Sequence, residues 1–102
     1  MNKAHRGYIY QFLEKDGTTN KNCLVVSSKN RETNKIISIL MIGTRDGFNS
    51  VCIGDGEYVH CDLVSFCDRK RLGKPICMIN DSVLKEIDKG IFKALGGEDE
   101  RE

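Results

Sequence analysis

The sequence has no long apolar run, which argues against a membrane-spanning helix. Its longest apolar stretch, residues 36–42, contains Ser38 and is much shorter than the roughly 20 residues that a spanning helix needs. The first six residues are mostly polar or charged and contain no apolar core of a secretory signal. We therefore expect a cytoplasmic protein that makes no contact with a membrane.

Proline occurs once, and neither sign of charge dominates the 102 residues, of which 39% are apolar. This composition is typical of one compact domain with a single hydrophobic core, and not of a disordered or fibrous chain. Residues 98–102 contain four acids and one base, which leaves 15 basic against 11 acidic residues elsewhere, a net charge of +4. We expect one domain over residues 1–97 and a disordered acidic tail over 98–102.

Paired cysteine motifs are also missing. The chain has an odd number of cysteines and no sign of secretion, so reduced thiols are expected instead of a disulfide framework. Only His60 and Cys61 with Cys67 approach the spacing of a zinc site, and no fourth ligand follows at a suitable spacing. We interpret the cysteines as small buried side chains and expect neither a metal nor another cofactor.

Short β-branched runs between polar turns predict a mainly β fold. The expected strands cover residues 8–13, 23–26, 36–42, 50–53, 57–61, 63–67 and 75–79. Gly54-Asp55-Gly56 predicts a hairpin, because glycine permits positive φ. Pro75 restricts the last strand to an edge, or itself to the first position of that strand.

One helix is expected near the C-terminus. Apolar residues recur at every fourth position from Val83 to Leu95, Asn80 or Asp81 provides a cap, and Gly96-Gly97 ends the pattern. Polar connections at residues 14–21 and 43–47 are candidate ligand-binding loops, and 27–35 suits either a loop or a single helical turn. The basic run 69–71 suits either phosphate binding or a solvated turn.

Segments in this order resemble the MazF/PemK family of toxins, which are small ribonucleases of type II toxin-antitoxin systems. Residues 6–10, Arg-Gly-Tyr-Ile-Tyr, are similar to the family's R-G-(D/E)-(I/V)-(Y/W), and residues 24–28 are similar to its second strand. The fifteen residues 58–72 are similar to its V-x-C-(D/E)-Q-I-R-T-(V/I)-D-(K/R)-x-R-L, the most specific of the matches. The likeness extends from about Arg6 to Gly96.

The resemblance implies a small Src-homology-3-like barrel of antiparallel strands with one C-terminal α-helix, assembled as a homodimer. It also implies an enzyme that cleaves single-stranded RNA at specific sequences without a metal, and an antitoxin partner with an acidic C-terminal segment. In this reaction the ribose 2′-hydroxyl attacks the phosphorus and leaves a 2′,3′-cyclic phosphate. DNA lacks that hydroxyl, so we expect it to be bound but not cut.

The sequence departs from the family at the implied site. Lys21 and Asn22 stand where the family has Arg and Pro at the start of its second strand. The Thr that ends the third strand aligns with Gly43, and Thr44 follows one residue later, where a bulge would restore it. Residues 16–19, Asp-Gly-Thr-Thr, replace the family's G-S-E-Q type of first loop and lack the acid that stands at its third position.

We predict Lys21 and Thr44 as the catalytic residues. The Lys21 ammonium would meet charge on the phosphate, although as a point donor and not as the planar fork of an arginine. The Thr44 hydroxyl would donate to the phosphate or to the leaving oxygen. Further RNA-binding residues are expected at Thr18, Thr19, Lys29, Arg45 and Asp46. The simpler interpretation of each is a solvated loop or turn residue, and that of His60 is a structural role.

The sequence leaves different functions open. The resemblance favours a toxin endoribonuclease. The missing Arg, Pro and first-loop acid instead suit a PemK-like barrel that has lost catalysis and binds nucleic acid or a protein partner without cleavage. A weaker third hypothesis is poisoning of a protein target, as the related CcdB toxins act on DNA gyrase.

Overall fold

The computed structural model describes residues 3–96, and its elements follow the expected order. Seven strands and one α-helix are joined by short loops and two 3₁₀ turns. They are β1 (Tyr8–Phe12), β2 (Lys21–Val25), η1 (Lys29–Arg31), β3 (Ile36–Gly43), β4 (Ser50–Gly54), β5 (Glu57–His60), β6 (Ser65–Asp68), η2 (Arg69–Arg71), β7 (Leu72–Met78) and α1 (Asp81–Ala94). The predicted tail, residues 98–102, lies outside the described residues.

The strand boundaries differ from the prediction by up to three residues, most clearly at the starts of β2, β6 and β7. β6 begins at Ser65 and not at residue 63, because the chain turns first: the Leu63 N–H donates to the His60 carbonyl at 3.1 Å. β7 begins at Leu72, so Pro75 lies inside the strand. Proline is tolerated there because β7 is an edge strand, and the β1–β7 register shifts on both sides of the Tyr10–Pro75 pair.

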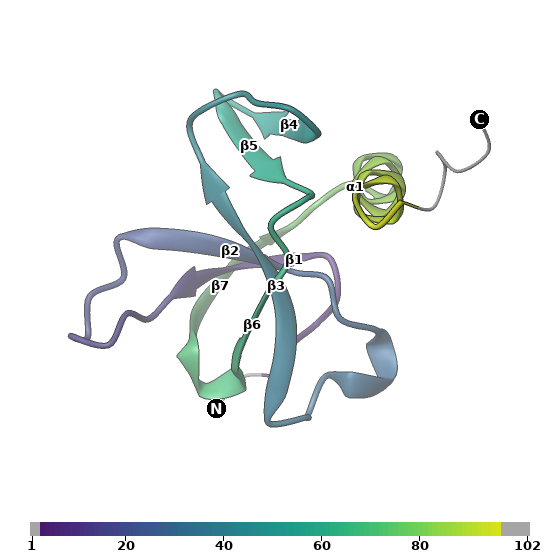
Figure 1. The fold of residues 1–102 in the computed structure, drawn as a ribbon. Helices are drawn as coiled ribbons and strands as arrows, with labels where there is room; N and C mark the ends of the chain where they lie inside the picture. The colour runs from purple at the N-terminus through teal and green to yellow at the C-terminus, as the bar shows by residue number, and fades with distance from the viewer. Residues whose placement is uncertain (1–2, 97–102) are drawn as a thin grey trace.

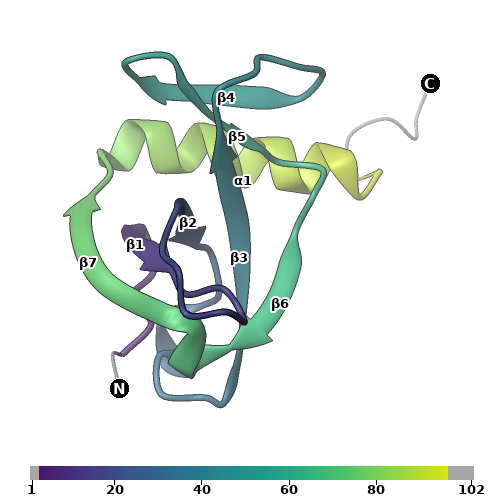
Figure 2. The same cartoon turned by 90° about the vertical axis from the view of Figure 1, so that its left-hand side faces the viewer.

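The sheet is antiparallel and is built around β3. Its strand order is β4-β5-β3-β2-β1-β7, and β6 pairs with the first half of β3 while β5 pairs with its end. Figure 2 shows β6 and β7 curving away on either side of β3 and meeting at η2. The result is an open half-barrel, a mainly β fold with one C-terminal helix, as the sequence predicted.

The sheet separates two apolar clusters, whereas the sequence predicted one core. Tyr10, Cys23 and Ile39 belong to the cluster inside the half-barrel. Their neighbours along the strands, such as Ile9 and Leu24, belong to a second cluster that also contains Ile87 of α1. Because successive side chains of a strand point to opposite faces, a sheet covered on both sides divides the core of one small fold.

α1 covers the outer face of the sheet, next to the β4–β5 hairpin (Figures 1 and 2). The Asn80 side chain caps the helix by accepting from the Ser82 N–H at 2.8 Å. The chain entering β1 is tied to the helix by an ion pair between the Arg6 guanidinium and the Asp88 carboxylate, with an N···O distance of 2.5 Å. These contacts confirm the predicted helix and its cap.

Gly90 lies where α1 approaches the sheet most closely. A Cβ at this position would lie 2.7 Å from Cys61 Sγ and 3.0 Å from Cys61 Cβ, and Cys61 is fully buried. Gly→Ala in an exposed helix normally stabilises a protein by about 0.5–1 kcal/mol. Here we expect Gly90→Ala to lower the free energy of unfolding by about 1–3 kcal/mol through overpacking, measured by urea denaturation. Lys89→Ala, on the exposed side, should change it by less than about 0.5 kcal/mol.

All five cysteines are free thiols in the structure, but their environments differ. Cys52 and Cys77 are exposed, whereas burial raises the pKa of Cys23 to about 12 and also raises the pKa of Cys61 and Cys67. A raised pKa leaves less of the reactive thiolate near pH 8. We expect two thiols to react rapidly with Ellman's reagent in the native protein and five after denaturation without reductant. Fewer than five after denaturation would indicate a disulfide.

Candidate functional site

A pocket of about 420 Å³ opens over the end of β3. Its lining combines apolar walls with three polar side chains, Lys21, His60 and Ser65. The remaining lining residues are Met41, Ile42, Gly43 and Leu63. Such a lining suits a nucleotide, which offers a flat apolar base and a charged phosphate.

Strand order determines how the two basic side chains, Lys21 and His60, face the pocket. β3 lies between β2 and β5, so Lys21 at the start of β2 and His60 at the end of β5 approach the floor from opposite sides. Two strand spacings alone separate their backbones by about 10 Å, and the register adds an offset along β3. This spacing leaves room for a phosphate between the two side chains.

Glu14 is the acid that the sequence analysis did not identify. Lys21 Nζ lies 3.8 Å from Glu14 Oε2, so a carboxylate stands beside the pocket although residues 16–19 lack the family's acid. The β1–β2 loop that carries it is anchored at its base, because Arg71 Nε donates to the Leu13 carbonyl at 2.5 Å. Glu14 precedes the predicted loop motif, and only the folded loop shows that it meets Lys21.

Thr18 and Thr19 are exposed on this loop. The Thr18 backbone N–H and hydroxyl both donate to Asp16 Oδ1, at 3.0 and 2.8 Å, and the Thr18 carbonyl accepts from the Glu14 N–H at 2.8 Å. The two hydrogen bonds that Thr18 donates, from its backbone N–H first and its hydroxyl second, lower the pKa of Asp16. Thr18 therefore shapes the loop that presents Glu14.

Gly43, and not Thr44, lines the pocket. Gly43 is the last residue of β3, and a side chain built there would meet nothing within 4 Å. Thr44, Arg45 and Asp46 follow in the exposed β3–β4 loop, where Asp46 Oδ1 accepts from the Ser50 hydroxyl at 2.7 Å. The loop thus begins at the pocket edge, with Thr44 as its first residue.

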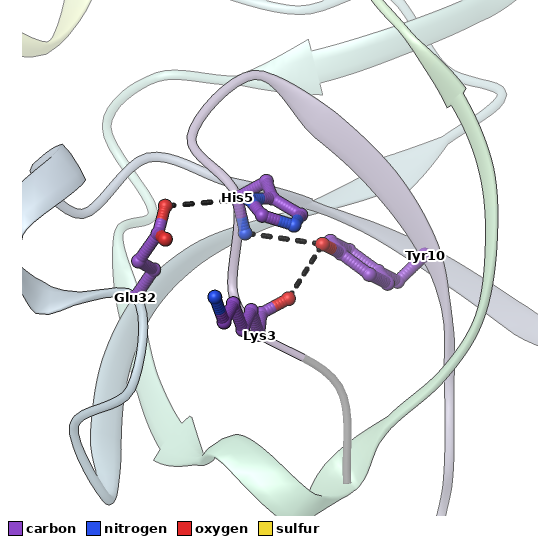
Figure 3. Close-up of polar contacts among 4 residues, drawn as sticks. All are labelled: Lys3, His5, Tyr10 and Glu32. Carbon is purple, nitrogen blue, oxygen red and sulfur yellow. Dashed lines mark hydrogen bonds and ion pairs between the residues drawn. The ribbon is translucent and has the colours of Figure 1, made fainter.

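Lys29 belongs to a different hollow. It lines a space of about 290 Å³ with residues of the N-terminal segment and of the chain after η1, including His5 and Glu32, and shares no lining residue with the Lys21 pocket. Figure 3 shows how this segment is held: the Tyr10 hydroxyl donates to the Lys3 carbonyl at 2.7 Å and accepts from the His5 N–H at 3.0 Å. His5 Nδ1 also lies 3.3 Å from Glu32 Oε2.

The basic run 69–71 forms η2 and braces neighbouring loops. Arg69 Nε donates to the Asn34 carbonyl at 2.9 Å, and the Arg71 guanidinium lies over the Phe12 ring, 4.9 Å from its centroid. Over residues 3–96, no three His, Cys, Asp or Glu side chains are grouped as a metal site would require. The same residues include no helix with the length and apolar character needed to cross a membrane.

The half-barrel with its outer helix matches known structures. An endoribonuclease from a mycobacterial species superimposes with a TM-score of 0.80 at 21% identity, over 94% of each chain. Another mycobacterial endoribonuclease, solved in complex with its cognate antitoxin, gives 0.79 at 23% identity, over 94% of this chain and 96% of the other. MazF from Deinococcus radiodurans gives 0.73 at 16% identity, over 94% and 99%. The chain has the MazF fold.

Sequence comparison alone does not reach this result. A scan against protein-family models finds no match, and a search of curated proteins finds none either. The MazF fold was nevertheless indicated by the short motifs at residues 6–10 and 58–72. In the structure, 6–10 leads into and includes most of β1, and 58–72 runs from β5 to the start of β7 along β3.

Proposed function

We propose that the protein is the toxin of a type II toxin-antitoxin system and acts in the cytoplasm as a sequence-specific, metal-independent endoribonuclease on single-stranded RNA. The observation that carries the proposal is the Lys21 pocket on the MazF fold, where Lys21 and His60 lie beside the end of β3 and the Glu14 carboxylate is 3.8 Å from the Lys21 ammonium. The similarity to structures of endoribonucleases supports it.

The groups at this pocket suit a transfer in which the 2′-hydroxyl attacks the adjacent phosphorus. Lys21 balances the negative charge that grows on the phosphate oxygens. Glu14, 3.8 Å from Lys21 Nζ, takes the proton of the 2′-hydroxyl as a general base. Thr44 donates to the phosphate from the pocket edge, and Thr18, Thr19, Arg45 and Asp46 line the path of the RNA along the two loops.

The test is to incubate the purified protein with a long mixed-sequence RNA and to map the ends. We expect cuts at a restricted set of sequences, 2′,3′-cyclic phosphate and 5′-hydroxyl termini, and equal rates with EDTA or magnesium. DNA of the same sequence should bind without being cut, because it lacks the nucleophile. If the protein binds RNA but cuts none, the function is that of a binding module and the nuclease proposal fails.

A homodimer belongs to this proposal. β7 is an edge strand, and its Ile76 and Met78 side chains are 48% and 64% exposed. An unpaired edge with exposed apolar residues offers a surface on which another chain can pair. Sedimentation at micromolar concentration is expected to give twice the mass of one chain. A single species with the mass of one chain would contradict the dimer.

An antitoxin is the second proposed partner, supported by the similar endoribonuclease solved with its cognate antitoxin. The body of the chain carries a net charge of +4, which attracts carboxylates as well as phosphates. We therefore expect an acidic C-terminal segment of the antitoxin to compete with RNA at Lys21 and Arg45, whereas Lys29, in a separate hollow, lies outside this shared surface. Adding an acidic peptide from the neighbouring gene product should release bound RNA. Unchanged RNA affinity would contradict a shared surface.

A further inference from the structure

We infer that His60 is the general acid that protonates the leaving 5′-oxygen of the RNA. The inference rests on the proposed nuclease function and assigns the one proton transfer that Lys21 and Glu14 leave open. Its basis is that His60 lines the same pocket as Lys21. The alternation of side chains along β5 did not indicate this role. It shows only that His60 and the buried Val59 point to opposite faces of the sheet.

The His60 ring lies against the β3–β4 loop at Gly47. A Cβ added to Gly47 would lie 3.3 Å from His60 Cε1 and 3.6 Å from Nδ1, while Nε2 is not among the atoms within 4 Å. The Nδ1 edge of the ring therefore faces the loop, and Nε2 is the nitrogen that remains for a ligand. Among residues 3–96, the ring makes no hydrogen bond or ion pair that would occupy it.

Strand order separates the acid from the base. In-line displacement at phosphorus requires the attacking and leaving oxygens on opposite sides, so the group that removes a proton and the group that supplies one must also stand apart. Glu14 is beside Lys21 at the β2 side of the pocket, and His60 reaches it from β5, with β3 between them. Histidine is the residue most often used for such proton transfers.

The 2′-oxygen forms a bond to phosphorus as its proton passes to the Glu14 carboxylate, and the bond from phosphorus to the 5′-oxygen breaks as that oxygen takes the proton of His60 Nε2. The products are a 2′,3′-cyclic phosphate and a free 5′-hydroxyl. Glu14 then loses its proton to water and His60 regains one, which restores the starting state.

The test compares an RNA oligonucleotide with a second one in which sulfur replaces the 5′-oxygen at the cleaved linkage. A thiolate leaves without being protonated, so the sulfur substrate does not need a general acid. His60→Gln is expected to cleave the oxygen substrate on the order of a hundredfold more slowly than the parent. It should cleave the sulfur substrate within severalfold of the parent rate. Its circular dichroism and thermal midpoint should match those of the parent.

Glu14→Gln is the matched control, because loss of the base should slow both substrates alike. His60→Gln that is equally slow on both substrates, or as fast as the parent on the oxygen substrate, would overturn the assignment of His60 while the nuclease function stands. If the parent cuts neither substrate, the proposed function itself fails and this inference fails with it. If His60 has only a structural role, His60→Gln should cleave both substrates more slowly, and this result distinguishes a structural role from general-acid catalysis.

Discussion

Lys21→Ala is expected to reduce the rate of RNA cleavage by on the order of a hundredfold, because it removes the cation that meets charge developing on the phosphate. The fold should not be affected. The Lys21 side chain is 63% exposed, and its 3.8 Å ion pair with Glu14 is of the exposed kind that contributes little to stability. Cleavage is measured under single-turnover conditions, and folding is measured by urea denaturation.

Lys15→Ala is the matched control for this change. Lys15 is an exposed lysine of the same loop, so its loss removes the same charge without emptying the pocket. We expect a rate within about threefold of the parent, because a single surface charge away from the reacting atoms acts through screened attraction alone. Lys21→Arg should keep most of the activity, since a guanidinium also binds phosphate. A Lys21→Ala protein that cuts RNA at the parent rate would remove Lys21 from the mechanism.

The fold could be predicted because local and global signals agree along most of the chain. Alternation in β1, continuous apolar runs in β2 and β3, and a four-residue repeat in α1 each specify both an element and the face it buries. The prediction of a single core failed for a physical reason. Period-two alternation places Ile9 and Tyr10 on opposite faces, but it does not show that both faces will be covered.

The site was less predictable because its groups come from segments that are distant in sequence. Lys21 was predicted because it stands where the MazF/PemK family has an arginine, and in the structure it lines the pocket from the start of β2. No local sequence pattern marks Glu14 or His60 as a site residue. The fold of the β1–β2 loop brings Glu14 to Lys21, and the pairing of β5 with β3 brings His60 to the pocket that Lys21 lines. Lys29 is close to β2 in the sequence, but in the structure it lines a different hollow from Lys21.

Glu14→Gln is expected to lower the cleavage rate by at least on the order of a hundredfold, because the amide cannot accept the proton of the 2′-hydroxyl. The substitution keeps the size of the side chain and its distance from Lys21, so RNA binding should weaken little or become tighter as a negative charge is lost. The expected signature is therefore a lower single-turnover rate at saturating RNA with an unchanged or lower dissociation constant.

The control for Glu14 is Asp16→Asn, which removes one negative charge from the same loop. Asp16 Oδ1 already accepts from the Thr18 N–H and hydroxyl, and these bonds hold the pKa of Asp16 below its usual value, so it is a poor proton acceptor. We expect Asp16→Asn to cut RNA within severalfold of the parent. Were the two variants equally slow, the loss would reflect the shape or charge of the loop. The catalytic base would then have to be sought elsewhere at the pocket.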